Sequence, residues 1–213
     1  MVVANELLPM EFQVAMRLLA DDSIDLILTD PPWDDKFGTV ATYTNLSEQA
    51  ARVLKPGCSL ITYIGHNSIR NALEGLSTHL RYWWLCYVRL YGPARRLPGK
   101  WVEPVGRPLL WFVNGYRRDR NFVTDVVDVH STAKKSGHPW AQHEEVAQHF
   151  IDRLTSPGET VYDPFAGSGT IPYVAAKSGR VWVASEIDEL YWAPITQRAQ
   201  MGELECDTHA LPS

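Results

Sequence analysis

The chain has 213 residues, of which 45% are hydrophobic and 21% are charged, and its formal net charge is −5. This length and hydrophobic content favour one compact α/β domain, residues 1–213, over two full domains. The three cysteines lie far apart and show no Cys/His ligand spacing, so the sequence predicts neither a disulfide framework nor a metal site.

The N-terminal residues 1–10 lack the basic region and the long apolar run of a signal peptide. No stretch approaches 18 consecutive apolar residues, which a membrane-spanning helix would need. We therefore expect a cytoplasmic protein of a bacterial or phage-infected cell, with no membrane partner.

Charge is distributed unevenly along the chain. Residues 81–140 contain eleven Lys and Arg against four acids, so this segment carries +7 and the remainder carries −12. Such asymmetry indicates a surface that faces a polyanion, although an ordinary solvated charged face is the alternative. The candidate phosphate contacts are Arg95, Arg96, Lys100, Arg107, Arg117, Arg118, Lys134 and Lys135.

Alternating apolar strands and amphipathic helices predict a parallel α/β sheet. The first clear strand, residues 24–29, ends at Asp30-Pro31-Pro32, because proline cannot continue a ladder. Asn45 and Glu48 resemble a capping box and predict a helix that ends at the turn 55–57. Further strands are expected at 58–64, 82–88 and 109–113, with Trp83, Trp84 and Trp111 as core residues.

The last third of the chain predicts a βαβ unit with a glycine-rich first turn. A helix over 142–154 is followed by a strand at 160–162, the loop 163–170, a helix to about 177 and a strand at 180–185. A strand, a glycine loop and a helix N-terminus present backbone N–H groups to a ligand.

An acid at the end of the strand 180–185 completes the predicted ligand site at the glycine loop. Glu186 follows Gly167 by nineteen residues, the distance at which an acid can accept hydrogen bonds from ribose hydroxyls. Pro172 replaces the third glycine of a dinucleotide fingerprint, and the loop has no Walker lysine. A nucleoside ligand without a pyrophosphate therefore suits the loop better than a dinucleotide.

The second motif is Asp30-Pro31-Pro32-Trp33, directly after a predicted buried strand. A carboxylate and a backbone carbonyl can both accept hydrogen bonds from one exocyclic NH₂ group, and an aromatic ring can stack on the base. Asp-Pro-Pro alone is a common loop opener. Its pairing with the glycine loop favours a catalytic interpretation.

Together, these motifs resemble the amino-methylating DNA methyltransferases of the permuted, beta-type arrangement. That family has its Asp-Pro-Pro-aromatic motif first, a target-recognition region second and the cofactor motif Asp-Pro-Phe-x-Gly-Ser-Gly-Thr last. Here the same order runs from residues 30–33 through the basic segment to residues 163–170. The stretch Gly137-His138-Pro139-Trp140, with Gln142, also resembles the family.

The resemblance implies a Rossmann-like methyltransferase sheet with a circularly permuted motif order and S-adenosyl-L-methionine as the cofactor. It implies double-stranded DNA as the partner, a monomer or homodimer, and residues 91–135 as a small target-recognition insertion. The implied catalytic residues are Asp30, Pro31, Pro32 and Trp33. The implied cofactor-binding residues are Asp163, Pro164, Phe165, Ala166, Gly167, Ser168, Gly169, Thr170, Glu186, Asp188 and His138.

Adenine is the expected target, because cytosine-specific enzymes of this type more often begin the first motif with serine. The target base would be flipped out of the duplex, and the amine would attack the methyl group directly. The alternatives are an RNA adenine or a DNA cytosine amino-methyltransferase, a nicotinamide oxidoreductase, which Pro172 disfavours, and a non-catalytic nucleic-acid-binding module.

Overall fold

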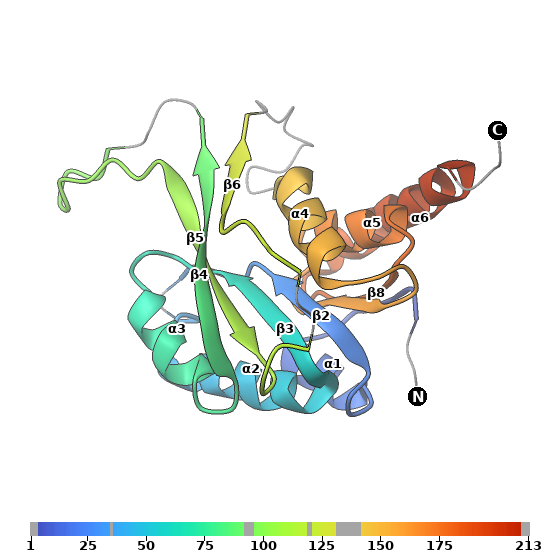
Figure 1. Cartoon of the computed structure of the whole chain (residues 1–213), viewed down its shortest axis with the longest axis horizontal. Coiled ribbons are helices and arrows are strands. Elements are labelled where there is room, and N and C mark those ends of the chain that lie inside the picture. Colours follow the sequence, from blue (N-terminus) through green and yellow to red (C-terminus); the bar gives the residue numbers. More distant parts are fainter. Residues whose placement is uncertain (1–3, 35, 92–95, 119–120, 131–141, 210–213) are drawn as a thin grey trace.

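The computed structural model describes residues 4–34, 36–91, 96–118, 121–130 and 142–209, and of residues 207–209 only the backbone. Its centre is an eight-stranded sheet with the order β1-β8-β7-β2-β3-β5-β4-β6 (Figure 1). The strands are β1 (Glu6–Leu8), β2 (Ile24–Thr29), β3 (Leu54–Tyr63), β4 (Arg81–Leu90), β5 (Gly106–Val113), β6 (Val126–Val129), β7 (Thr160–Asp163) and β8 (Val181–Ser185).

Six α-helices and one short 3-10 helix accompany the sheet in the described part of the chain. They are α1 (Phe12–Leu18), α2 (Val40–Val53), α3 (Ile69–Leu76), α4 (Glu144–Leu154), α5 (Thr170–Lys177), η1 (Glu189–Tyr191) and α6 (Trp192–His209). Two hydrophobic clusters lie on the two faces of the sheet. One contains residues of α1, α2 and α3, and the other contains residues of α4, α5 and α6 (Figure 1).

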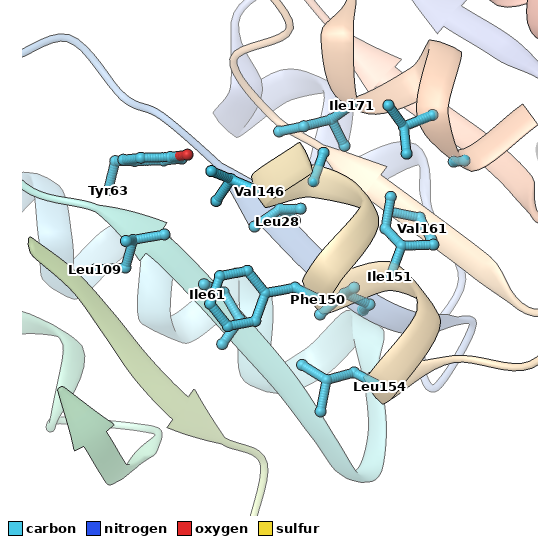
Figure 2. Close-up of a cluster of buried hydrophobic side chains, with 14 of the residues drawn as sticks. Leu28, Ile61, Tyr63, Leu109, Val146, Phe150, Ile151, Leu154, Val161 and Ile171 are labelled. Atoms are coloured by element: carbon cyan, nitrogen blue, oxygen red, sulfur yellow. The ribbon is translucent and has the colours of Figure 1, made fainter. Parts of the chain in front are cut away.

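Helix α4 shows how an amphipathic sequence covers the sheet. Its apolar residues Val146, Phe150, Ile151 and Leu154 recur at helical spacing and face Leu28, Ile61 and Val161 of the strands (Figure 2). Phe150 and Ile151 are completely buried. This spacing predicted the helix from sequence, and the structure confirms it.

The sheet is mixed, which corrects the expectation of a parallel sheet. Strands β1, β8, β7, β2 and β3 pair in parallel, whereas β5 runs antiparallel to both β3 and β4. The edge strand β6 pairs in parallel with β4. Because β5 is reversed, it begins at the edge of the sheet where the parallel strands end.

Several element boundaries differ from the sequence prediction. Helix α2 begins five residues before Asn45, and Thr39 caps it by accepting a hydrogen bond of 3.2 Å from the Thr42 N–H, so the predicted capping box is wrong. Residues 55–57 belong to β3 instead of a turn. Trp111 is buried as expected, but Trp84 is 54% exposed and donates a hydrogen bond to Asp125.

The predicted recognition insertion, residues 91–135, contains strand β5 of the central sheet. Leu109 and Phe112 of β5 are fully buried between β3 and β4. Residues 106–113 therefore belong to the sheet, and the insertion as a separate unit stays a prediction. Within the described residues, no helix is both long and apolar enough to cross a membrane.

Candidate active site

A cavity of about 390 Å³ opens at the carboxyl ends of the parallel strands. Its volume lies in the range typical of small-molecule sites, roughly 300–1,000 Å³. The lining combines the first motif with the glycine loop: Asp30, Pro31, Pro32, Trp33, Arg107, Gln142, Phe165, Ala166, Gly167 and Ser168. The structure therefore brings together two motifs that lie more than 130 residues apart in sequence.

Asp30 is the carboxylate of this cavity, placed there because β2 ends at Thr29. Its Oδ1 accepts a hydrogen bond of 2.8 Å from Trp33 Nε1, and the Gln142 side chain also hydrogen bonds to it. Burial raises the pKa of Asp30 to about 6, against the opposing effects of the Arg107 charge and of both hydrogen bonds. The carboxylate is thus held in place and mostly ionised at neutral pH.

Trp33 forms one wall of the cavity. Its side chain is 43% exposed, and the hydrogen bond to Asp30 fixes the orientation of the indole ring. The Arg107 guanidinium carbon lies 5.4 Å from the ring centroid. An oriented and accessible indole offers a flat surface on which a planar ligand can stack.

The glycine loop connects β7 to α5, as the sequence predicted. Gly167 and Gly169 have φ angles of +47° and +74°, which favour glycine, and Gly169 directly precedes α5. A Cβ atom on Gly169 would lie 3.0 Å from the Ile195 Cα atom of α6. Glycine at this position thus permits both the left-handed turn and the close approach of α6.

Glu186 orders this loop from the end of β8. One carboxylate oxygen accepts a hydrogen bond of 2.8 Å from the Gly167 N–H, and the other accepts one of 2.9 Å from the Asp188 N–H. Each carboxylate oxygen keeps a second lone pair for a ligand hydroxyl. The nineteen-residue spacing predicted from sequence therefore corresponds to direct contact with the loop.

Six of the described cofactor candidates lie outside the cavity lining: Gly169 and Glu186, described above, and Asp163, Pro164, Thr170 and Asp188. Asp163 is 1% exposed and accepts a hydrogen bond from Thr29, and the Pro164 carbonyl accepts one from Ser185. Thr170 accepts one from Arg198, and the Asp188 side chain caps η1 through the Leu190 N–H. These contacts position the residues that do line the cavity.

Asp163 is the most deeply buried of these supporting acids. Its pKa is raised to about 7, mainly by burial and also by the negative charges of Asp30 and Glu186, against hydrogen bonds from the Thr29 side chain and the Phe165 N–H. The three acids repel one another, which favours a ligand that carries positive charge near the loop.

The basic segment does not form one continuous surface. Arg107 lies in the cavity, whereas Arg118 lies at the opposite edge of the sheet, where it binds the buried Asp25 at 3.1 Å and also Glu159 at 2.5 Å. The charge of Arg118 compensates a buried acid, and its role as a phosphate contact stays a prediction. Arg117 packs 4.9 Å from the centroid of the Trp111 ring, with its guanidinium bonded to the Asn121 carbonyl.

The hairpin between β4 and β5 carries the remaining described candidates. Leu97 and Val102 form an isolated antiparallel bridge, and Arg96 pairs with Glu103 at 2.6 Å. Lys100 is exposed, and Trp101 beside it is 92% exposed. Four predicted site residues lie outside the described part of the chain: Arg95, Lys134, Lys135 and His138.

Two cavity residues had no catalytic role in the sequence prediction. Gln142 was noted only for its place in a family-like stretch, and Arg107 was assigned to DNA phosphates. The antiparallel direction of β5 is the signal that locates Arg107. An antiparallel β5 begins where the parallel strands end, and this brings Arg107 to the cavity. Among the described residues, no group of three or more His, Cys, Asp or Glu could hold a metal ion.

Comparison with known proteins gives one consistent family. The family described as DNA methylase matches residues 100–197. Type II methyltransferase M.HpaI from Haemophilus parainfluenzae is 26% identical, over 83% of this chain and 68% of its own length. The putative methylase YubD from Escherichia coli (strain K12) is 25% identical, over 86% of this chain and 85% of its own length.

These matches support an amino-methyltransferase family. The resemblance inferred from the motifs is thereby confirmed at the level of the family. The chain spans 62% of a further relative, type II methyltransferase M.BglII from Bacillus subtilis, so the full relatives contain segments beyond the matched part.

Two solved structures share the fold of this chain. PvuII DNA methyltransferase, described as cytosine-N4-specific, gives a TM-score of 0.75 at 16% identity and covers 95% of this chain and 91% of its own. The M1.HpyAVI–SAM complex gives a TM-score of 0.72 at 18% identity and covers 91% of this chain and 98% of its own. The predicted Rossmann-like methyltransferase fold is thereby confirmed.

Proposed function

We propose that this chain transfers a methyl group from S-adenosyl-L-methionine to the exocyclic amine of adenine in double-stranded DNA. The observation that carries the proposal is the shared cavity. Asp30 and Trp33, which suit an amino group and a base, face the same space as Phe165 and Gly167 of the glycine loop. A donor and an acceptor bound there would meet without a large rearrangement.

The residues at the loop fit the proposed cofactor. Glu186 has acceptor capacity for ribose hydroxyls, and the loop offers backbone N–H groups at the start of α5. The acids Asp30, Asp163 and Glu186 suit a cofactor that carries a sulfonium and an ammonium group. The bound cofactor supplies an electrophilic methyl group, and the M1.HpyAVI–SAM complex supports its choice.

Asp30 orients the acceptor amine in this proposal. The carboxylate accepts a hydrogen bond from the amine, and the Pro31 carbonyl accepts the second amine hydrogen, so the nitrogen lone pair points at the methyl group. Because the pKa of Asp30 is about 6, the side chain is mainly a carboxylate above this pH and accepts hydrogen bonds. Orientation of this kind can contribute roughly 7–11 kcal/mol to catalysis.

The base must leave the duplex to reach Asp30, because its amino group is paired inside the helix. The exposed Trp33 ring then provides a stacking surface in the cavity. Base–aromatic stacking is worth about 1–3 kcal/mol per base, which offsets part of the cost of unstacking. Transfer is direct, so none of the three cysteines acts as a nucleophile; Cys58 and Cys86 are buried in the sheet.

Cytosine is the second candidate target. The fold similarity to PvuII DNA methyltransferase, a cytosine-N4-specific enzyme, favours it. The aspartate at position 30 favours adenine, since the cytosine enzymes that the motif resembles more often have serine there. We further propose that the protein works as a monomer or homodimer in the cytoplasm of a bacterial or phage-infected cell.

The decisive experiment is nucleoside mass spectrometry after incubation with the cofactor and either duplex DNA or RNA. Genomic DNA of mixed composition serves as the duplex, because it contains every short recognition site. We expect N6-methyladenine in DNA and none with the Asp30→Ala variant. Mainly N4-methylcytosine would reject adenine as the target, and methylation of RNA alone would reject DNA.

A further inference from the structure

Arg107 occupies a position that differs from every other cation of the basic segment whose side chain is described. It is the second residue of β5, and β5 begins at the carboxyl edge of the sheet because it runs antiparallel to β3. Its side chain lines the cavity with Asp30 and Trp33. Gly106, just before it, fixes this start of the strand, since a Cβ atom there would lie 2.1 Å from the Val88 carbonyl oxygen.

The Arg107 guanidinium lies near the two residues that receive the base in the proposed function. It lies 5.4 Å from the centroid of the Trp33 ring, within the range of a cation–π contact. Its charge acts on Asp30, and within the described part of the chain no carboxylate forms an ion pair with it at 4 Å or less. A guanidinium in this place can stabilise a partly buried carboxylate through space.

The other groups around Asp30 do not supply positive charge. Tyr43 of α2 and Tyr63 of β3 feel the charge of Asp30 and are neutral phenols at physiological pH, while Asp163 of β7 is an acid. Trp33 and Gln142 contribute neutral hydrogen bonds. Arg107 is therefore the cation that opposes the burial of Asp30 among the described residues.

We propose that Arg107 is a positioning residue of the target pocket, where it holds the Asp30 carboxylate ionised and the Trp33 ring in place, instead of contacting DNA phosphates. This inference deepens the proposed function and rests on it for its catalytic consequence. Its electrostatic part concerns the protein alone, so it can be tested without DNA or cofactor.

The first test follows the Trp33 indole N–H by ¹H–¹⁵N NMR as the pH is raised. This group donates to Asp30 Oδ1 and reports when the carboxylate loses its proton. The Trp33→Phe variant identifies its signal among the eight tryptophans. We expect the midpoint to rise by about 1 pH unit in Arg107→Met, because the positive charge of Arg107 lowers the pKa of Asp30 and its removal raises that pKa.

Three further variants make the NMR test specific. Arg107→Lys keeps the charge and should stay near the unmodified midpoint, and Arg107→Gln repeats the loss of charge with a polar side chain if Arg107→Met is poorly folded. Arg17→Met removes an exposed arginine of α1, outside the cavity lining, and should not move the midpoint. Equal midpoints in the Arg107→Gln, Arg107→Met and unmodified proteins would overturn the inference.

The second test compares methyl transfer with DNA binding. We expect the acidic limb of the single-turnover pH profile to move upward in Arg107→Met by the same amount as the NMR midpoint, while the salt dependence of DNA affinity stays unchanged. A salt slope smaller by about 0.9, with an unmoved pH profile, would show a phosphate contact and overturn the inference. No methyl transfer by the unmodified protein to any nucleic acid would instead reject the proposed function, and the NMR titration would still decide the electrostatic part.

Discussion

Thr29 donates a hydrogen bond of 2.7 Å from its side chain to the Asp163 carboxylate, and both residues are buried. Thr29 ends β2 just before the Asp-Pro-Pro-Trp motif, and Asp163 ends β7 just before the glycine loop. This one contact therefore ties together the two motifs that line the cavity.

Replacing Thr29 with valine keeps the shape of the side chain and removes the donor. The buried Asp163 carboxylate then loses a partner, which should lower the free energy of unfolding by about 1–3 kcal/mol. Urea unfolding at pH 8 measures the loss. The loss should be smaller at pH 5, where Asp163 is protonated, and a pH-independent loss would contradict the role of the carboxylate.

The raised pKa of Asp163 predicts a specific dependence of stability on pH. Its pKa is about 7 in the folded protein and near 3.8 in the unfolded chain, so the folded state binds the proton more tightly. Between these two values the folded state holds more protons, and stability falls as the pH rises. In Asp163→Asn, the free energy of unfolding should fall less steeply between about pH 4 and pH 7. Urea unfolding of the variant and of the unmodified protein over this pH range measures the difference. The same dependence of stability on pH in both proteins would contradict the raised pKa of Asp163.

Glu186 should be needed for cofactor binding. Glu186→Ala removes the acceptor for ribose hydroxyls and the partner of the Gly167 N–H, so cofactor affinity should fall by about 1–3 kcal/mol. Calorimetry with S-adenosyl-L-methionine measures the change. Glu186→Gln, which keeps one acceptor oxygen, should lose less, and an Ala variant with normal affinity would remove Glu186 from the cofactor site.

Replacing Asp30 should have the opposite effect: methyl transfer is lost, whereas cofactor binding is kept. Asp30→Ala deletes an interaction that is used mainly in the transition state, so single-turnover transfer should be almost abolished while cofactor affinity stays close to normal. The same calorimetric and transfer assays serve both variants. Full transfer activity in Asp30→Ala would remove the aspartate from catalysis.

The hairpin between β4 and β5 should contribute to DNA affinity. Lys100 and Arg96 are the described cations of this hairpin, and Lys100→Ala should reduce the salt slope of DNA binding by about 0.9 if it contacts one phosphate. Fluorescence anisotropy over a range of salt concentrations measures the slope. Arg17→Ala on α1 is the charge-matched control, and equal slopes for the two variants would place the DNA surface elsewhere.

The sequence predicted the parts of the fold that local chemistry determines. The apolar run of β2 and its proline stop, the glycine loop with its positive φ angles, and Glu186 after β8 all appear where the residues indicated. Each of these features depends on a few neighbouring residues. For this reason, eight of the ten residues that line the cavity could be named as catalytic or cofactor-binding candidates from the amino-acid sequence alone.

The sequence did not predict strand direction, so it did not predict which basic residue lies at the cavity. Arg107 and Arg118 belong to the same basic segment, but Arg107 lies at the start of β5 and Arg118 follows its end, so they lie at opposite edges of the sheet. Eight residues of a strand span roughly 26 Å, at about 3.3 Å each, so one residue reaches the cavity and the other reaches Asp25. Counting charges along the chain cannot separate these two environments.

The reversed direction of β5 also determines on which side of the sheet the hairpin between β4 and β5 lies. Strand β4 ends, and β5 begins, on the same side of the sheet as the cavity, so the hairpin that carries Trp101 begins and ends on this side. Residues can be inserted or exchanged in this hairpin while the register of the sheet stays the same. The architecture thus keeps this hairpin apart from the elements that hold the cavity residues, and grafting the hairpin between relatives tests the prediction that it takes part in target choice.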